Sequence, residues 1–598
     1  MSVFLLAATA VALGFPVVRR LGIPAPDRWV LAPLVGIVIC AVGVSVVGAF
    51  SLRAAQLALF GIAAVSITLE LRRGRTIATP PSALPHPSPA WSALEMLALA
   101  AIVCANGMTF LSALAPIVHP GSAAEALAPA MEHAHRGRFG WAPWDGFAAP
   151  PLDAFLVLTT AAYSMGGETG AALLHWAYGA LACGSLYLLG RRLGGRPCGT
   201  ISAAMLATAP AFFTNGAELT DAMPLSALTA GALACLLAYR EAPRAAWLLP
   251  CGIFTGAVSG AGLVGLTIAL FLVAGAVVSL GRERSSAAMG MFTGGLLAVA
   301  APWAIYMAMH SPPPAWAWTG GWTAFLDPKR AALLSRETVT GTSRMDVAMF
   351  PWNIVMRPHW FDGWRYSPGP FLFLFVPPAM IACGWRVRSV APFAFAGVAA
   401  LFFLERLAGT MLPFFVPLFA VAAAGALHLR RLRTALRALV AVTLVSGIAV
   451  GGIAVHDRLR AALGEPDHES YLLAHVPRYA AIVWAKDTLE RDKRVVFFGP
   501  GAYYLGLPSI PGHAAIELTR GLEAEGRLRW LKEQDVEYLY LPMSHVIGNP
   551  AYDIPGYRET VEAWRSDSRH FKRLNMMSMP DAEGEGFDVV EIYELDYD

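Results

Sequence analysis

Apolar runs of about 17 to 25 residues, each long enough to cross a bilayer as a helix, recur from the start of the chain to about residue 455. Only 15% of the 598 residues are charged, whereas an ordinary soluble domain carries roughly 25%. A chain with so few charges cannot cover a water-facing surface over most of its length. The sequence therefore predicts a polytopic α-helical membrane protein.

The apolar runs predict about thirteen to fifteen transmembrane helices. We expect spans near residues 2–18, 29–49, 53–70, 94–118, 170–189, 197–214, 219–239, 245–262, 264–280, 287–308, 368–384, 391–405, 410–428 and 434–455. The first is interpreted as a retained span, because it lacks a basic n-region and Arg19-Arg20 follows it. The stretch 152–165 is apolar but short, and is either a further span or a helix at the interface.

Short loops rich in arginine mark the cytoplasmic side of a membrane protein. Such loops contain Arg19-Arg20, Arg72-Arg73, Arg191-Arg192, Arg240, Arg282, Arg386 and Arg430-Arg431. If 152–165 does not cross, the remaining connections all lie on the outer face. The 119–169 loop, the 309–367 loop, the turn at 215–221 and the region beyond 455 would then share that face.

The region after residue 455 has a different character. "RVVFFG" (494–499), "EYLYLP" (537–542) and "DVVEIYEL" (588–595) read as short strands, and "GLEAEGRLRWLKEQD" reads as a polar amphipathic helix. This alternation predicts a small α/β domain with its boundary near Gly464-Glu465-Pro466. We therefore expect N-terminal spans over 1–93, a transmembrane catalytic region over 94–455 and an extracytoplasmic α/β domain over 456–598.

Two carboxylates lie together before an apolar helix in "AELTDAMPLSAL". Glu218 and Asp221 are three residues apart, and they share one helical face if the helix begins by Glu218. Grouped carboxylates at a helix start can bind a divalent metal ion or act as a base. Asp221 can equally be an N-cap, and a capping carboxylate still has an oxygen for a metal.

The 309–367 loop combines cations with six tryptophans. Tryptophan favours the membrane interface, but cations on the outer side run against the usual charge bias and need an anionic partner. Lipid phosphate is the simplest such partner, with ordinary anchoring among lipid headgroups as the alternative. The candidate phosphate ligands are Lys329, Arg330, Arg336, Arg344, Arg357 and His359.

Several motifs, in their order along the chain, resemble the bacterial GT-C glycosyltransferases, the group of the protein O-mannosyltransferases and the lipid A aminoarabinose transferase. The first is an outer-loop helix ending in a Met ("AEALAPAM"), followed by an "RG" turn, "WAPWDGF" and "PPL". "ELTDAMPLSAL" is similar to the family's Asp-Met-Pro-Leu helix start, and "GIFTGAVSGAGLVGL" to its glycine-rich helix. "KRVVFFGPGAYYLGLP" and "WLKEQDVEYLYLP" resemble its soluble outer domain.

The resemblance implies transfer of a sugar from a polyprenyl-phosphate carrier to an acceptor, with the carboxylates of Asp221 and Glu125 as catalytic groups. It allows a divalent metal ion, for which Asp221 and Glu218 are the candidate ligands. The chain departs from the family pattern in its first loop, where the expected acid about ten residues before Met131 is missing. Glu125 is the nearest substitute, and His119 is a candidate base. The family's lysine is also absent from "SGAGL", and Thr410-Met411 stands where Arg-Tyr is usual.

The function expected from the sequence is a glycosyltransferase of the bacterial inner membrane that acts at the outer face. Its expected partners are the lipid-linked sugar, membrane lipids and an acceptor that is a lipid, glycan or protein; no nucleic acid is expected. Two alternatives remain open. The missing first-loop acid favours an inactive relative that binds lipid-linked sugar. A transporter would place charges at mid-membrane, and the apolar segments here carry almost none.

Overall fold

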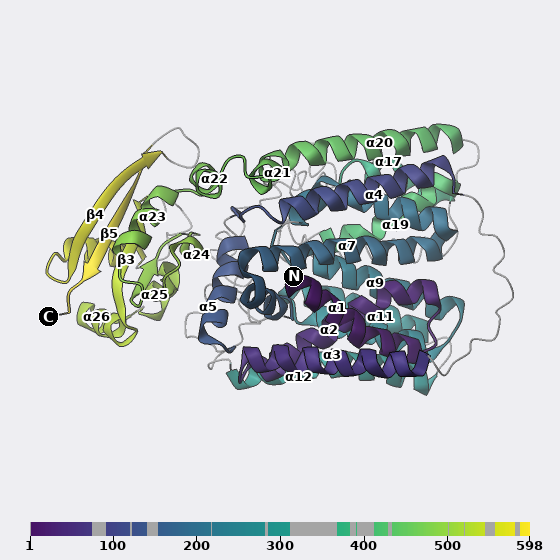
Figure 1. Ribbon diagram of the computed structural model, residues 1–598, viewed down its shortest axis with the longest axis horizontal. Helices are drawn as coiled ribbons and strands as arrows, with labels where there is room; N and C mark the ends of the chain where they lie inside the picture. The colour runs from purple at the N-terminus through teal and green to yellow at the C-terminus, as the bar shows by residue number, and fades with distance from the viewer. Residues whose placement is uncertain are drawn as a thin grey trace.

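A bundle of long apolar helices is followed by a small domain built on one sheet (Figure 1). The computed structural model describes residues 2–74, 91–119, 122–139, 154–216, 218–280, 285–310, 367–382, 390, 412–428, 433–499, 501–519, 521–543, 557–580 and 587–597. The predicted fold class, a polytopic helical membrane protein with a small C-terminal α/β domain, is confirmed.

Seven helices in the described ranges are long and apolar enough to cross a membrane, and three shorter apolar helices accompany them. The bundle consists of α1 (Ser2–Arg20), α2 (Ala25–Gly48), α3 (Leu52–Gly74), α4 (Ala93–Ser112), α7 (Ala154–Ala207), α8 (Pro210–Asn215), α9 (Ala222–Glu241), α10 (Leu248–Ser259), α11 (Gly262–Leu280), α12 (Ser286–His310), α17 (Phe371–Ala382), α19 (Leu412–His428) and α20 (Arg433–Ala454). The predicted span at 391–405 lies outside the described residues.

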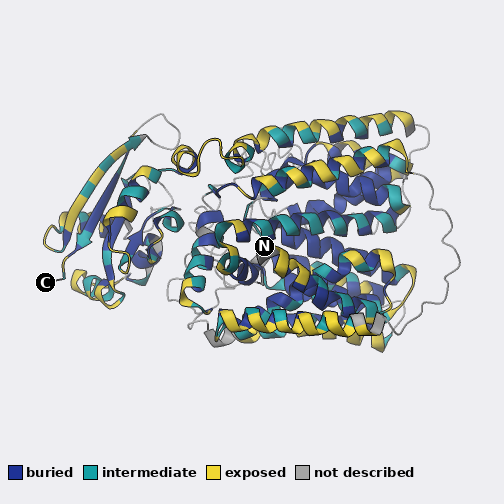
Figure 2. Ribbon diagram, in the orientation of Figure 1, coloured by how far each residue is buried: buried dark blue, intermediate teal, exposed yellow. Residues whose placement is uncertain are grey.

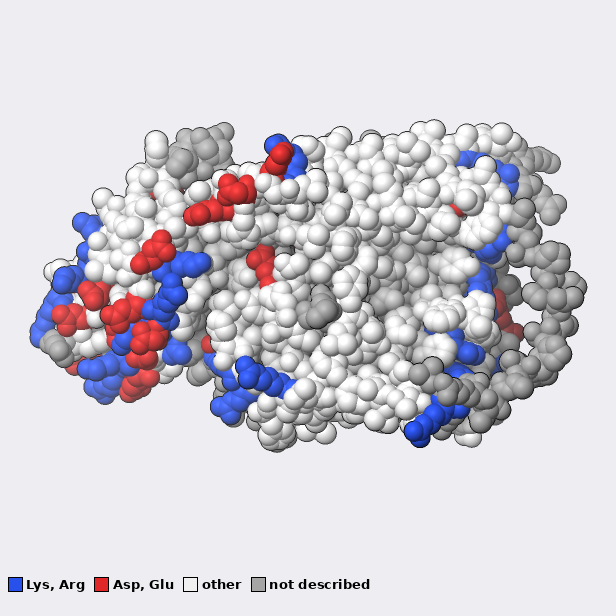
Figure 3. Space-filling model, in the orientation of Figure 1, with Lys and Arg blue, Asp and Glu red and all other residues white. Residues whose placement is uncertain are grey.

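The surface of the bundle matches a lipid environment. Figure 3 shows a broad belt almost free of charged residues, with charges gathered at its two ends. Helices α3, α12 and α20 at the rim expose large apolar side chains such as Leu57, Leu297 and Ile453, whereas α9 is enclosed by other helices (Figure 2). Water would oppose such exposure and hydrocarbon would not, so the belt is the membrane-facing surface.

Element α7 is a run of three antiparallel helical segments, 154–166, 168–193 and 196–207, separated by non-helical glycines. Thr159 Oγ1 lies 3.1 Å from His175 Nε2, although 16 residues of straight helix would separate them by about 24 Å. The chain therefore reverses at Gly167, whose φ of 61° suits glycine. It reverses again at Gly194 and Gly195, and the close packing of Gly190 against Ser202 shows that the two flanking segments lie side by side.

The segment 154–166 returns the chain to the end of the bundle at which α4 finishes. It contains 13 residues and so spans about 20 Å, which is less than a bilayer core. At its end, Glu168 bonds the backbone of Ile117, just beyond α4. The interpretation that 152–165 adds no crossing is consistent with this geometry.

Among the described residues, several arginines at helix ends gather at one end of the bundle. At one end, Asp27 at the start of α2 pairs with Arg191, at 3.2 Å, and with Arg192, next to the Gly194–Gly195 reversal. The same end holds ion pairs that join further helices: Glu95 with Arg196, Glu241 with Arg192, and Glu70 with Arg19. Ile117, Gly167 and the 218–221 turn lie at the opposite end, beside the C-terminal domain. We call these the arginine end and the domain end.

The C-terminal domain contains a five-stranded mixed sheet in the order β2-β1-β3-β5-β4. Its strands are β1 (Arg494–Phe497), β2 (Ser509–Pro511), β3 (Val536–Pro542), β4 (Phe571–Pro580) and β5 (Phe587–Leu595). Strands β1, β2 and β3 are parallel, whereas β5 pairs antiparallel with β3 and β4. The three predicted strands are confirmed; β2 and β4 are additional, because a three-residue strand and a methionine-rich polar strand give weak sequence signals.

Helices cover both faces of this sheet, and apolar clusters fill the space between. The covering helices are α22 (His468–His475), α23 (Tyr479–Thr488), α24 (Ala502–Leu505), α25 (Gly512–Leu518), α26 (Ala524–Glu533) and α27 (Tyr557–Ser566). Helix α26 confirms the predicted amphipathic helix. Arg565 on α27 binds Glu591 on β5 with two hydrogen bonds, of 2.6 and 2.9 Å. Burial raises the pKa of Glu591, but its bonds with Arg565 and Tyr593 outweigh burial and leave the pKa below its ordinary value.

Candidate active site

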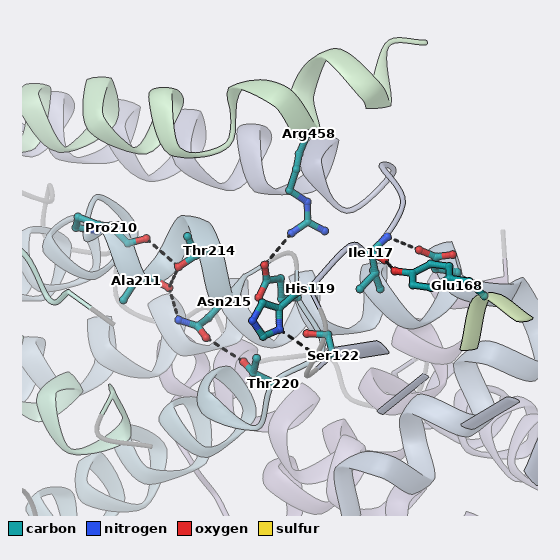
Figure 4. Close-up of polar contacts among 12 residues, drawn as sticks. Ile117, His119, Ser122, Glu168, Pro210, Ala211, Thr214, Asn215, Thr220 and Arg458 are labelled. Carbon is teal, nitrogen blue, oxygen red and sulfur yellow. Dashed lines mark hydrogen bonds and ion pairs between the residues drawn. The ribbon is translucent and has the colours of Figure 1, made fainter. Parts of the chain in front are cut away.

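The turn that carries Asp221 lies at the domain end and is held by α8. Asn215, the last residue of α8, donates from Nδ2 to the carbonyl of Ala211 at 2.8 Å. Its Oδ1 accepts a hydrogen bond from the Thr220 hydroxyl at 3.2 Å (Figure 4). Asn215 is almost fully buried, so its hydrogen bond holds Thr220, the residue before Asp221, in place.

Asp221 and Glu218 do not share a helical face. Helix α9 begins at Ala222, so both acids precede it and the expected common face is wrong. Asp221 occupies the N-cap position, but its backbone is helical and its side chain makes no capping hydrogen bond. The carboxylate is half-buried at the positive end of α9, where the helix dipole favours the charged form.

Glu218 forms an ion pair with a residue that the sequence reasoning missed. Arg458 lies on α21 (His456–Ala462), one turn after the last membrane helix, and its Nη1 is 3.4 Å from Glu218 Oε1. Both side chains are nearly buried, with 10% and 12% of their surfaces exposed. Burial lowers the pKa of Arg458 from its ordinary value, but a guanidinium stays charged at neutral pH. An arginine on the predicted outer side of a span, against the usual charge bias, was the available signal.

The loop that follows α4, which is predicted to be outer and which we call the first outer loop, reaches the same place from a distant part of the sequence. His119 starts the π-helix η1 (Ser122–Leu127): its Nδ1 accepts from the Ser122 amide at 3.3 Å and its carbonyl from the Ala123 amide at 3.0 Å. This capping leaves Nε2 as the protonated nitrogen of a neutral His119. A neutral imidazole in this arrangement donates from Nε2, and the role of His119 as a base stays a prediction.

The segments of Glu125 and Asp221 meet in one apolar cluster. Leu127, two residues after Glu125 on η1, and Leu219, two residues before Asp221, are both buried in it. Ala113, Ile117, Ala171 and Ala172 complete its buried centre. The backbone of Glu125 is therefore placed near the Asp221 turn, while its side chain lies outside the described residues.

The first-loop helix also extends further than its motif suggests. Helix α5 (Ala128–Arg136) continues η1 through Met131, so the expected end at the methionine is wrong. The Arg136-Gly137 turn closes it, with Gly137 at a φ of 67°. Helix α5 and the C-terminal domain contact each other through α24. The domain thus covers the first outer loop.

Glu168 is a second residue that sequence reasoning missed. Its carboxylate accepts hydrogen bonds from the Ile117 amide and, at 3.2 Å, from the Tyr503 hydroxyl on α24. The signal was an acid directly after Gly166-Gly167, at the end of a short apolar stretch.

The remaining predicted site residues cannot be placed in this geometry. Lys329, Arg330, Arg336, Arg344, Arg357 and His359 lie outside the described residues. The described part of the chain contains no group of three His, Cys, Asp or Glu side chains able to hold a metal ion. Glu218 already has Arg458 beside it, and a neighbouring cation disfavours a metal there. Metal ligation by Asp221 and Glu218 stays a prediction, and no step of the mechanism below depends on it.

The part of the chain that carries the Asp221 turn matches a known family. Residues 148–306 match the family described as dolichyl-phosphate-mannose-protein mannosyltransferase. The predicted resemblance to GT-C glycosyltransferases is confirmed. The match includes α9, α10 and the turn between Asn215 and Asp221, and supports transfer of a glycosyl group from a lipid-linked donor as the class of activity. No curated protein matches this chain significantly in sequence.

Three solved structures are similar to this chain over most of its length. Apo ArnT from Cupriavidus metallidurans has 16% identity and a TM-score of 0.49, over 84% of this chain and 98% of ArnT. The apo oligosaccharyltransferase of Archaeoglobus fulgidus has 14% identity and a TM-score of 0.40, over 75% and 70% of the two chains. The Archaeoglobus fulgidus oligosaccharyltransferase AglB, in complex with an inhibitory peptide and a dolichol-phosphate, has 13% identity and a TM-score of 0.38, over 83% and 74%.

Proposed function

We propose that this protein transfers a sugar from a polyprenyl-phosphate carrier to an acceptor at the domain end of the bundle. The observation that carries this proposal is the meeting of η1 with the Glu218–Asp221 turn, beside Arg458 and beneath the C-terminal domain. Acid-bearing segments from two parts of a membrane chain thereby face one region next to the bilayer, where a lipid-linked substrate would present its headgroup.

The reaction needs one carboxylate to take the proton of the acceptor, and cations to stabilise the negative charge on the leaving phosphate. The acceptor oxygen attacks the anomeric carbon, and the bond from that carbon to the phosphate oxygen breaks. The electron pair leaves with the phosphate, and the acceptor proton passes to a carboxylate. Asp221 is the proposed base, because it directly precedes α9 at the domain end and its carboxylate is only half-buried. Glu125 is the proposed second carboxylate, and its role is to orient the acceptor.

Phosphate is a good leaving group, so a strong general acid is not required. Stabilisation of its departing charge is the remaining task, and guanidinium groups perform it well. We assign this role to the cations of the 309–367 loop, among them Arg336, Arg344 and Arg357. Arg458 contributes positive potential at the same end while it orients Glu218.

The domain end is proposed to be extracytoplasmic, in the inner membrane of a bacterium. The arginines of the opposite end support this orientation, because arginine-rich short loops stay in the cytoplasm. Labelling of single-cysteine variants in intact cells with a membrane-impermeant maleimide tests it. Position 525 on α26 should be labelled and position 20 should not; the reverse pattern would refute the orientation.

A reconstituted assay tests the transfer itself. The purified chain in liposomes is given radiolabelled polyprenyl-phosphate sugar and a membrane lipid extract, and the label is followed into new products. Wild type should transfer label, Asp221→Asn should not, and Asp492→Asn, the same change at an exposed turn of the C-terminal domain, should match wild type. Donor binding without turnover in wild type would favour the alternative of an inactive, sugar-lipid-binding relative. Turnover intact in Asp221→Asn would remove Asp221 from the mechanism.

A further inference from the structure

Glu168 links three segments that are far apart in the sequence. It follows the Gly167 reversal and opens the helical segment 168–193, where the helix dipole favours a carboxylate. One oxygen accepts from the backbone amide of Ile117 in the first outer loop, and the other accepts from the Tyr503 hydroxyl in the C-terminal domain. A single side chain therefore ties the membrane bundle to both outer parts, and Figure 4 shows its bond with the Ile117 backbone.

Both backbone polar groups of Ile117 are hydrogen-bonded. While Glu168 accepts from its amide, the Tyr504 hydroxyl donates to its carbonyl. Burial raises the pKa of both tyrosines far above neutrality, so both hydroxyls keep the protons that they donate. The tyrosines are adjacent on α24, so one short helix of the C-terminal domain contacts both the loop and its anchor.

Apolar contacts surround these polar bonds. The Tyr503 ring packs edge-on against Tyr163 at 6.3 Å, and both rings border the cluster of Ile117, Leu127 and Leu219. Val118, the next residue of the loop, packs against the apolar core of the C-terminal domain. Partial exclusion of water strengthens the hydrogen bonds of Glu168 and makes their loss costly.

The anchored peptide lies immediately before η1. His119, two residues after Ile117, caps η1 through its ring and its carbonyl. A shift of Ile117 would therefore carry His119 and the start of η1 with it. It would change the distance between the Glu125 backbone and the turn of Asp221.

We propose that Glu168 is a positioning residue, which fixes the first outer loop between the bundle and the C-terminal domain so that η1 stays beside the Glu218–Asp221 turn. Its importance for turnover rests on the proposed transferase function, whereas its effect on the loop does not. The role requires hydrogen-bonding capacity at position 168 rather than a negative charge. Glutamine meets this requirement, since its carbonyl accepts from the Ile117 amide and its NH2 donates to the Tyr503 oxygen.

The test compares Glu168→Gln, Glu168→Leu and Tyr503→Phe with wild type, and uses the exposed Glu525→Leu as control. Hydrogen–deuterium exchange of residues 113–127 in nanodiscs measures the anchor, and the transfer assay measures kcat and KM for the lipid donor. We expect Glu168→Leu to speed exchange in this segment and lower kcat at least about tenfold with little change in KM. Tyr503→Phe should have a smaller effect of the same kind, while Glu168→Gln and Glu525→Leu stay close to wild type.

Two results would overturn the proposal. Unchanged exchange at 113–127 in both Glu168→Leu and Tyr503→Phe would show that the loop does not depend on this anchor. Loss of turnover in Glu168→Gln with wild-type exchange would show that the negative charge takes part in the chemistry. If wild type transfers no sugar, the proposed function fails, and the exchange measurement alone still decides whether Glu168 holds the loop.

Discussion

Arg458 and Glu218 form an ion pair of 3.4 Å that joins α21, the short helix after the last membrane helix, to the turn before Asp221. The two residues are 240 positions apart, and both side chains are nearly buried. The helix that leads into the C-terminal domain is thus bonded directly to the candidate active site. A change in the docking of the domain would be felt at the turn that carries Asp221.

Removal of one partner of this pair should destabilise the protein strongly. Arg458→Met leaves the Glu218 carboxylate buried without its cation, and we expect a loss of about 3 kcal/mol of stability. The double variant Arg458→Met with Glu218→Met should recover most of this loss. Thermal unfolding in detergent measures both. Arg573→Met, which removes an exposed arginine from Glu591 while Arg565 still binds that carboxylate, should cost under about 1 kcal/mol. Equal costs for the two arginines would contradict the structural role of Arg458.

Asp221→Asn should lower kcat by about 10²-fold to 10⁴-fold, because the amide cannot accept the acceptor proton. The KM for the lipid donor should change little, since the substitution keeps the shape of the side chain and removes only its charge. Initial rates at varied donor concentration provide both values. A large rise in KM with kcat preserved would instead assign Asp221 to donor binding.

Gly167→Ala should misplace Glu168. The backbone of Gly167 has φ of 61° and ψ of −154°, a region that is accessible essentially to glycine alone. A side chain there should cost about 1–3 kcal/mol and also reduce turnover, because Glu168 follows directly. Gly61→Ala is the matched control: Gly61 is inside helix α3 and an added methyl group meets nothing within 4 Å. It should leave both stability and turnover unchanged or slightly improved.

Acid should destabilise the first outer loop through His133. This side chain on α5 is 4% exposed and packs edge-on against Phe139, and burial lowers its pKa from 6.5 to about 4. Because the folded pKa is below the unfolded one, protons favour the unfolded chain. The stability contributed by neutral His133 is complete above pH 6.5 and is lost as pH falls toward 4, by up to about 3 kcal/mol.

Unfolding midpoints between pH 7.5 and pH 4 measure this effect. His133→Leu should flatten the dependence, whereas His135→Leu, at the exposed neighbour two residues along, should leave it in place. A pH profile identical in wild type and His133→Leu would refute this source of acid sensitivity.

The sequence by itself determined the class of the protein and the order of its parts. Long apolar runs must be helices in a bilayer, since hydrocarbon offers no partner for backbone amides, and arginines sort the loops to two ends. Alternation of strands and an amphipathic helix was sufficient to predict the C-terminal domain. Asp221 could be proposed as a site residue because an acid directly before an apolar helix is visible in a local pattern.

Only the tertiary structure decided which distant residues meet at the site. The roles proposed for Arg458 and Glu168 depend on their contacts with Glu218, Ile117 and Tyr503. These contacts join residues that are 51 to 335 positions apart, and no local pattern encodes them. The start of α9 at Ala222 was equally undetermined, because "ELTD" is compatible with both a helix and a turn until Asn215 binds Thr220. Periodicity reports which face of an element is buried, whereas the partners on that face are selected by packing of the whole chain.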